Sequence, residues 1–179
     1  MQFGRLIRHV VASHWRTRML FPKSSLDAIE QAVARAERTH AGEIRFAIET
    51  SLPPLHVIND VVPRARALEV FATLRVWDTE RNNGVLIYVE LADRIVEIVA
   101  DRGLDGRVTP AEWAAVCRLM EEHFREGHYE LGSIAGVDAV GTLLARQFPR
   151  AADVAAAGAA AAKDAAAPHN QLPDRPTLL

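Results

Sequence analysis

The sequence lacks the features of a secreted or disulfide-stabilised protein. Cys117 is the single cysteine, which excludes an internal disulfide bond. No signal peptide is visible, because Leu6 and Ile7 are followed at once by Arg8 and His9. No apolar stretch is long enough to span a bilayer. P-loop, GxSxG, HExxH and paired CxxC motifs are missing, and the seven histidines are scattered without evident zinc-ligand spacing. We therefore expect a cytoplasmic protein without a familiar catalytic motif.

The overall charge is small but unevenly distributed. The chain of 179 residues has a net charge of −2, which does not favour nucleic acid as a partner. Residues 1–23 carry five basic side chains and no acid, so this segment is +5 and the remainder is −7. We predict a basic amphipathic arm over residues 1–22, which either packs on its own domain or lies on an anionic membrane. Residues 151–179 are rich in alanine and proline, and we predict a disordered tail there.

Residues 23–150 alternate between helical and strand patterns. Apolar periodicity, proline and glycine predict helices over 24–42, from about 63, from Thr109 to Gly127 and over 132–147, and strands over 43–50, 85–89 and 95–100. The helical crossover between the first two strands makes them parallel, and the tight turn at 91–94 makes the third antiparallel. This order predicts an α/β fold with a mixed sheet.

Polar residues collect where this topology brings three strand ends together. The amino-terminal ends of the parallel strands and the carboxyl end of the third strand share one edge of the sheet. The side chains expected there are Glu43, Asp78, Glu80, Arg81, Asn82, Asn83, Asp101 and Arg102, with Gly103 beside them. A cluster of oxygen atoms without histidine or cysteine favours calcium or magnesium over zinc. In the alternative, Arg81 and Arg102 neutralise the acids as a structural ion-pair network.

Residues 101–112 follow much of the spacing of a calcium-binding loop. The pattern D-x-[DN]-x-[DN]-G-x5-E is matched by acids at positions one, five and twelve, and these are Asp101, Asp105 and Glu112. Gly106 stands at the sharp turn. Position three is Gly103, so one ligand is lost, and Glu112 also fits a capping box with Thr109. A glycine turn before a well-capped helix is the alternative interpretation.

Several short motifs in this order resemble the TPM domain family. They are Gly42-Glu43-Ile44, Asn82-Asn83-Gly84-Val85-Leu86-Ile87, Asp93-Arg94 and Asp101-Arg102-Gly103. The resemblance covers residues 21–149 and is greatest to the short bacterial branch without signal peptide or transmembrane helix. It implies a three-layer α/β/α sandwich with a small mixed central sheet. Plant relatives have been assigned acid phosphatase activity and a role in photosystem repair, and several bacterial relatives bind calcium or similar ions at the acidic end of the sheet.

These observations lead to one expected function and two alternatives. We expect a non-catalytic module that binds a divalent cation, calcium rather than magnesium, and acts through an unidentified protein partner, at the membrane or in envelope-complex maintenance. The expected metal ligands are Glu43, Asp78, Asp101, Asp105 and Glu112, and the remaining binding residues are Glu80, Arg81, Asn82, Asn83, Arg102 and Gly103. The alternatives are a metal-assisted acid phosphatase acting on phosphomonoesters and a peripheral assembly factor at the inner membrane that uses residues 1–22. No residue is assigned a catalytic role.

Overall fold

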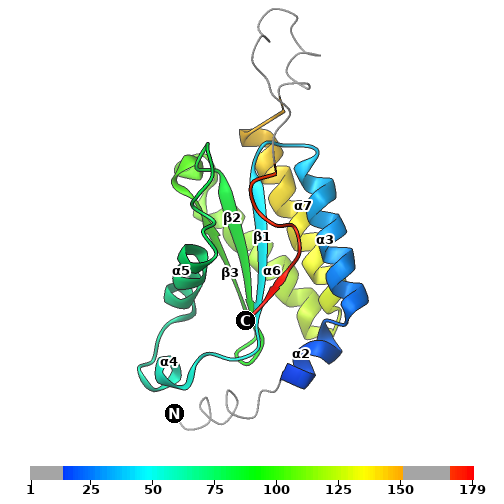
Figure 1. Ribbon diagram of the computed structural model, residues 1–179, viewed down its shortest axis with the longest axis vertical. Coiled ribbons are helices and arrows are strands. Elements are labelled where there is room, and N and C mark those ends of the chain that lie inside the picture. The colour runs from blue at the N-terminus through cyan, green and yellow to red at the C-terminus, as the bar shows by residue number, and fades with distance from the viewer. Residues whose placement is uncertain (1–13, 151–169) are drawn as a thin grey trace, which may run out of the picture.

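The computed structural model describes residues 14–150 and 170–179. Its elements are α2 (His14–Leu20), α3 (Lys23–Glu37), β1 (Glu43–Glu49), α4 (Pro54–Ile58), α5 (Pro63–Thr73), β2 (Gly84–Glu90), β3 (Ile95–Ala100), the 3-10 helix η1 (Arg102–Leu104), α6 (Pro110–Arg125), α7 (Tyr129–Gln147) and β4 (Thr177–Leu178) (Figure 1). The predicted helices and strands over residues 23–150 occur in the predicted order, and the short helix α4 and the 3-10 helix η1 are additional elements that we did not predict. Most of the predicted amino-terminal arm and residues 151–169 of the predicted tail lie outside the described residues.

The four strands form one mixed sheet in the order β3-β2-β1-β4. β1 and β2 are parallel, with Glu43 opposite Gly84 and Glu49 opposite Glu90. β2 and β3 are antiparallel, with Val85 opposite Ala100. The crossover through α5 and the tight turn after β2 therefore give the strand directions that the sequence predicts.

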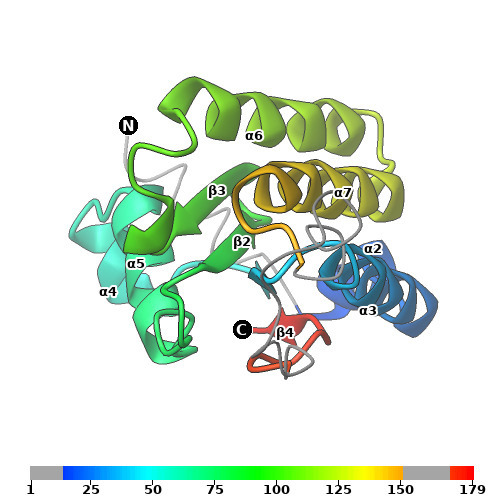
Figure 2. The same ribbon diagram turned by 90° about the horizontal axis from the view of Figure 1, so that it is seen from above.

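Helices cover both faces of the sheet, which confirms the predicted three-layer α/β/α sandwich. α3, α6 and α7 lie on one side of the sheet, while α4 and α5 lie on the other (Figure 2). Alternation along β2 directs Val85, Ile87 and Val89 into the core under α3, α6 and α7, and Leu86 and Tyr88 into the core under α5. All of β2 is buried, as expected of a central strand covered on both faces.

Gly42 has a different role from the one its position suggests. The sequence predicts that a helix ends at Gly42, but α3 ends at Glu37, and Gly42 is not among the glycines with positive φ. A Cβ at Gly42 would come within 2.9 Å of Leu144 Cδ2. The glycine therefore lets the chain enter β1 in close contact with the Leu144 side chain on α7.

The carboxyl-terminal segment 170–179 is ordered, so the prediction of a disordered tail is wrong for these residues. β4 pairs with β1 in parallel, and Leu172 is buried in the core under α5. The Arg45 guanidinium donates hydrogen bonds to the carbonyl oxygens of Pro173 and Arg175 and to the Thr177 hydroxyl. These partners are about 130 positions away from Arg45 in the chain, so no local pattern indicates the pairing.

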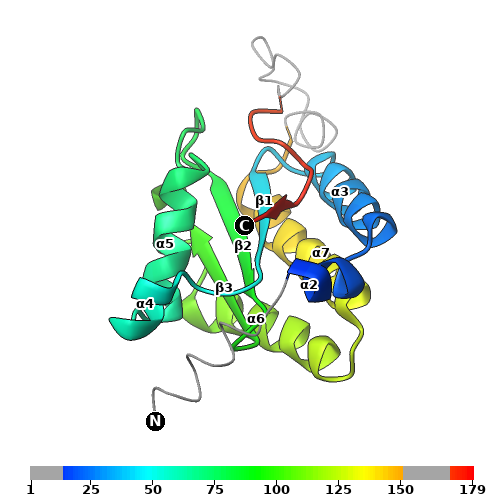
Figure 3. The same cartoon turned by 60° about the horizontal axis from the view of Figure 1, so that its bottom comes forward.

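The end of the basic arm packs on its own domain. Phe21, directly after α2, is buried and lies edge-on to Phe124 and Tyr129, with ring centroids 6.5 and 5.7 Å apart. Thr17 is also buried and forms a 2.7 Å hydrogen bond with Thr50. α2 consequently lies beside the start of α7 (Figure 3). Among residues 14–150 and 170–179, no helix combines the length and apolar character needed to cross a bilayer.

Candidate functional site

The loop before β2 is fixed to the rest of the sheet by Asn83. Its backbone N–H donates to Thr79 Oγ1 at 3.1 Å, its side-chain amide donates to the Ala41 carbonyl, and its own carbonyl accepts from the Glu43 N–H. Asn82, one residue earlier, adopts a positive φ of 51°, a conformation that asparagine tolerates better than most residues. Asn83 therefore joins the loop 78–83 to the start of β1, and its Oδ1 is buried without a hydrogen-bond partner.

Asp101 connects the same loop to the end of β3. Its N–H donates to the Gly84 carbonyl at 2.9 Å, and its Oδ1 accepts from the Arg102 N–H at 2.7 Å, which caps η1. Gly103 N–H donates to the Asn82 carbonyl at 2.9 Å, and Arg102 Nε donates to Asn82 Oδ1 at 3.0 Å. Asp101 is only 8% exposed, and its Oδ2 is buried with no hydrogen-bond partner.

Gly103 lets two loop carbonyls approach this edge closely. A Cβ on Gly103 would collide with the Asn82 carbonyl oxygen and lie 2.7 Å from the Arg81 carbonyl oxygen. Two backbone oxygens therefore face Gly103. This glycine is two residues after Asp101, whose Oδ2 atom has no hydrogen-bond partner. The structure brings Asp101, Arg102 and Gly103 together with Asn82 and Asn83, as the topology predicts.

Glu43 lies at the same edge but is already engaged. It is buried, and its Oε2 accepts from the backbone N–H groups of Gln171 at 3.3 Å and Leu172 at 3.2 Å. Burial raises the pKa of Glu43 above its ordinary value, and these backbone donors oppose the shift. The carboxyl-terminal segment thus occupies one oxygen of a carboxylate that we expected to bind metal.

The remaining expected ligands are dispersed. Asp78, Glu80 and Arg81 are exposed on the loop, and Asp105 is exposed after η1. Glu112 completes the predicted capping box with Thr109 and pairs with Arg146 at 2.6 Å. Across residues 14–150 and 170–179, the expected acids do not provide three carboxylate oxygens within 4.8 Å of one another. Asp101, Asp105 and Glu112 therefore do not form a closed calcium loop in this conformation.

The alternative of a neutralising ion-pair network finds no support at this edge. Within residues 14–150, no ion pair joins Arg81 or Arg102 to Asp78, Glu80 or Asp101. Arg102 instead bonds the neutral Asn82 side chain. The Asp101 carboxylate is consequently not neutralised by an ion pair, and a buried carboxylate oxygen without a partner is costly.

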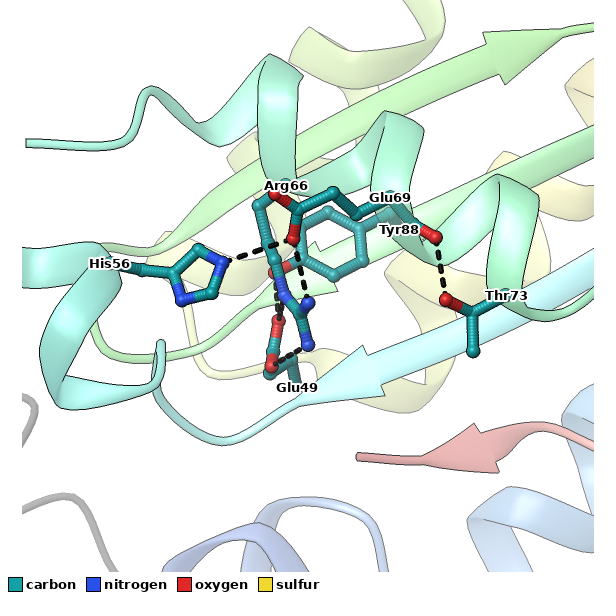
Figure 4. A network of polar contacts seen from close by, with 6 residues as sticks. All are labelled: Glu49, His56, Arg66, Glu69, Thr73 and Tyr88. Carbon is teal, nitrogen blue, oxygen red and sulfur yellow. Dashed lines mark hydrogen bonds and ion pairs between the residues drawn. The ribbon is translucent and has the colours of Figure 1, made fainter. Parts of the chain in front are cut away.

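A second polar cluster, which we did not expect from the sequence, lies at the carboxyl ends of the parallel strands (Figure 4). Arg66 on α5 holds Glu49 with two hydrogen bonds of 3.0 and 2.7 Å, and the Tyr88 hydroxyl donates to the same carboxylate. Glu69 bridges Arg66 and His56 at 3.0 Å each. A partial signal was present, since Glu49 is a charged residue at the end of β1. The paired charges of Arg66, Glu49 and Glu69 anchor α5 to the sheet, while His56 Nδ1 is buried without a hydrogen-bond partner.

A groove of about 710 Å³ runs between the β3 edge and α6. Its lining includes Arg64, Glu97, Cys117 and Glu121. Burial raises the pKa of the Cys117 thiol to about 11, so the thiolate is scarce at neutral pH. This supports the interpretation of Cys117 as a packing residue.

Comparisons with known proteins agree with the fold. The family model described as the TPM domain matches residues 17–143. The NMR structure of the BA42 protein from the psychrophilic bacterium Bizionia argentinensis is similar, with a TM-score of 0.69 and 26% identity over 87% of this chain and 92% of that one. The solution structure of the N-terminal domain of a P. gingivalis protein has a TM-score of 0.51 and 25% identity, over 72% of this chain and 79% of that one. The search of curated proteins gives no match.

Proposed function

The chain belongs to the TPM domain family, and from that premise we propose that it is a non-catalytic module binding a hard divalent cation at the edge formed by Asp101 and the loop 78–83. The observation that carries the proposal is the buried Asp101 Oδ2 atom without a hydrogen-bond partner. A cation would supply the missing charge and the missing contact in one step.

The other atoms at this edge suit calcium better than a transition metal. The backbone carbonyls of Arg81 and Asn82 approach Gly103 closely, and calcium accepts a mixture of carboxylate and carbonyl oxygens in flexible geometry. The Asp78 and Glu80 side chains are exposed on the loop rim, from which they can turn inward to complete the ligand set. Magnesium demands a stricter octahedral arrangement, so it fits this edge less well.

A bound ion would also give a protein partner a defined surface. Trp77 is 51% exposed at the start of the same loop. Tryptophan is enriched among residues that dominate protein interfaces. We infer that ordering of loop 78–83 by the ion presents Trp77 to an unidentified protein partner.

Calcium binding by the full chain tests the proposal. Calorimetric titration and thermal unfolding in about 10 mM calcium should show binding and a higher Tm, because a ligand that binds only the folded state stabilises it by about 2.7 kcal/mol at one hundred times its Kd. Asp101→Asn keeps a capping side chain for η1 but removes the charge, and it should abolish the gain. Asp138→Asn, an exposed change on α7, is the matched control and should retain it. A gain that persists in Asp101→Asn would refute the site, as would no response of the wild-type chain.

The second candidate function is contact with an anionic membrane through α2. Trp15 and Met19 are 71% and 60% exposed there, beside the exposed Arg16 and Arg18. Aromatic and apolar side chains next to basic ones favour the interface of anionic lipids. Cosedimentation with phosphatidylglycerol vesicles, lost in Trp15→Ala and in neutral phosphatidylcholine vesicles, is the expected result. Equal sedimentation with both lipids would exclude it.

A metal-assisted phosphatase at the same edge is the enzymatic alternative. The exposed Arg81 side chain lies on the rim, where it could contact a phosphate held by the ion. Turnover of p-nitrophenyl phosphate that requires calcium or magnesium and disappears in Asp101→Asn would support this activity. Turnover that is unaffected by the substitution would assign it to a contaminant and remove the alternative.

A further inference from the structure

The turn between α6 and α7 brings two histidines and a glutamate together. The chain reverses at Gly127, which has a φ of 85°. His128 N–H donates to the His123 carbonyl at 2.9 Å and Gly127 N–H donates to the Phe124 carbonyl at 3.1 Å. This pair of bonds is a Schellman motif. In this motif the N–H of the residue two positions after the helix cap donates to the carbonyl of the residue three positions before the cap. Both of those residues are histidine here, and the cap itself is Glu126.

We propose that His123, Glu126 and His128 bind a divalent transition metal of the zinc class. One ligand atom from each residue lies within 4.8 Å of the other two. Within residues 14–150 and 170–179, no other group of three histidine, cysteine, aspartate or glutamate side chains meets this spacing. Two imidazoles and a carboxylate suit Zn²⁺, Ni²⁺, Cu²⁺ or Co²⁺ rather than calcium or magnesium.

Small side-chain rotations are enough to close the site. Tetrahedral zinc with bonds of about 2.0–2.1 Å separates its ligand atoms by roughly 3.3 Å. His128 Nδ1 and Glu126 Oε2 are already 3.3 Å apart, and both side chains are more than half exposed and free to turn. Three protein ligands would leave a fourth position for water or for a group on a partner.

The backbone around this turn is held rigidly. The Phe124 and Tyr129 rings stack with centroids 5.1 Å apart, so they tie the end of α6 to the start of α7. Gly132 on α7 packs directly on α6, because a Cβ there would lie 2.7 Å from the His123 Cβ. Only side-chain freedom is therefore lost on metal binding, which favours affinity.

The charges near the turn do not compete for the ligands. Arg125 is the basic residue between His123 and His128 in the sequence. Its Nη2 atom lies 3.8 Å from Oε2 of Glu121, one turn earlier on α6. Glu126 is thereby left to pair with His128. The spacing of His123 and His128, with four residues between them, also falls within the range of paired zinc histidines, so the sequence does hold a zinc signal that we did not expect.

This site is separate from the edge near Asp101. α6 begins after η1 at that edge and runs along the sheet to the opposite end of the molecule (Figures 1 and 3). The two sites also differ in chemistry, since one presents oxygen atoms alone and the other presents imidazole nitrogen. Substitutions at one site can therefore test it without touching the other.

Zinc titration of the tag-free full chain by calorimetry tests the proposal. One Zn²⁺ should bind per chain, and His123→Gln and His128→Gln should each weaken binding at least about tenfold. His56→Gln is the matched control. His56 Nε2 also lies close to a glutamate, 3.0 Å from Glu69 Oε2, but this pair does not include a second histidine. His56→Gln and Asp101→Asn should both leave zinc affinity unchanged.

Other outcomes would overturn the site. Unchanged affinity in His128→Gln would place zinc elsewhere, and loss of binding in His56→Gln would do the same. Circular dichroism should show a wild-type fold for His128→Gln and Glu126→Gln, because both side chains are exposed. We expect a Kd of about 1 μM for zinc, so failure of the wild-type chain to bind at about 0.1 mM zinc would refute the proposal directly.

Discussion

Glu37 should make the stability of this protein depend on pH. It is the last residue of α3 and is 8% exposed, and its Oε1 accepts from the Ile44 N–H at 2.9 Å. Burial raises the pKa of Glu37 from 4.5 to about 8; the Ile44 hydrogen bond opposes this shift, and the nearby Glu43 and Asp174 carboxyl groups add to it. We predict that the wild-type chain loses more stability between these two pH values than Glu37→Gln does.

The sign follows from where the proton resides. Below pH 4.5 Glu37 is protonated in both the folded and the unfolded chain, so its contribution is fully present. Above that pH the unfolded chain releases the proton while the folded chain retains it, and the free energy of unfolding falls until about pH 8. At about 1.4 kcal/mol for each pH unit, the ceiling is about 5 kcal/mol. Relaxation around the ionised group should reduce the observed loss to about 2 kcal/mol.

Urea denaturation at about pH 5.5 and about pH 8.5 measures the loss in the free energy of unfolding, because these two values bracket most of the pH range in which Glu37 destabilises the folded chain. The glutamine in Glu37→Gln keeps an oxygen that can accept from Ile44 but carries no charge, so only the wild-type chain should weaken through this residue. Burial also raises the pKa of Glu90 to about 7, and that group titrates equally in both proteins. The difference between the two pH responses therefore reports Glu37 together with its electrostatic interaction with Glu43. Parallel responses of wild type and Glu37→Gln would refute the reasoning.

Three further substitutions test the packing and the caps. Leu172→Ala should lower the free energy of unfolding by about 2–3 kcal/mol and expose the carboxyl-terminal segment to proteolysis, because this side chain is buried in the core; unchanged proteolysis would contradict the docked segment. Gly84→Ala should lower the Tm by more than a surface change does, since a Cβ there would collide with the Val76 carbonyl oxygen; a Tm equal to that of wild type would exclude this close approach. Thr109→Ala should cost about 1 kcal/mol in urea denaturation, because it removes the hydroxyl that accepts from the Glu112 N–H in the capping box; no loss would show that the box is not formed in solution.

Several parts of the fold could be predicted because their causes are local. The alternation in 43–50 and the continuous apolar run 85–89 both predict strands, and both are strands in the structure. The Thr109–Glu112 box and the glycine at 127 mark the start and end of α6 as observed. Strand directions follow from the lengths of the connections, so the meeting of Asp101 with Asn82 and Asn83 could also be predicted.

The candidate site could be predicted only in part. Topology identifies which strand ends share an edge but not which partner each side chain finds there. Glu43 was expected to bind an ion and instead accepts hydrogen bonds from Gln171 and Leu172. Glu112 matched both a calcium loop and a helix cap, and the cap prevailed because its partner, Thr109, is three residues away and already in place.

The sequence alone determined the α/β class, the strand directions and most helix ends, because each depends on residues close together in the chain. Only the tertiary structure decided the fate of residues 170–179, the pairing of Arg66 with Glu49, and the isolation of the Asp101 carboxylate oxygen. The physical reason is the same in each case. Burial and charge compensation depend on which distant segments meet, and a side chain with several possible partners takes the one that packing brings to it.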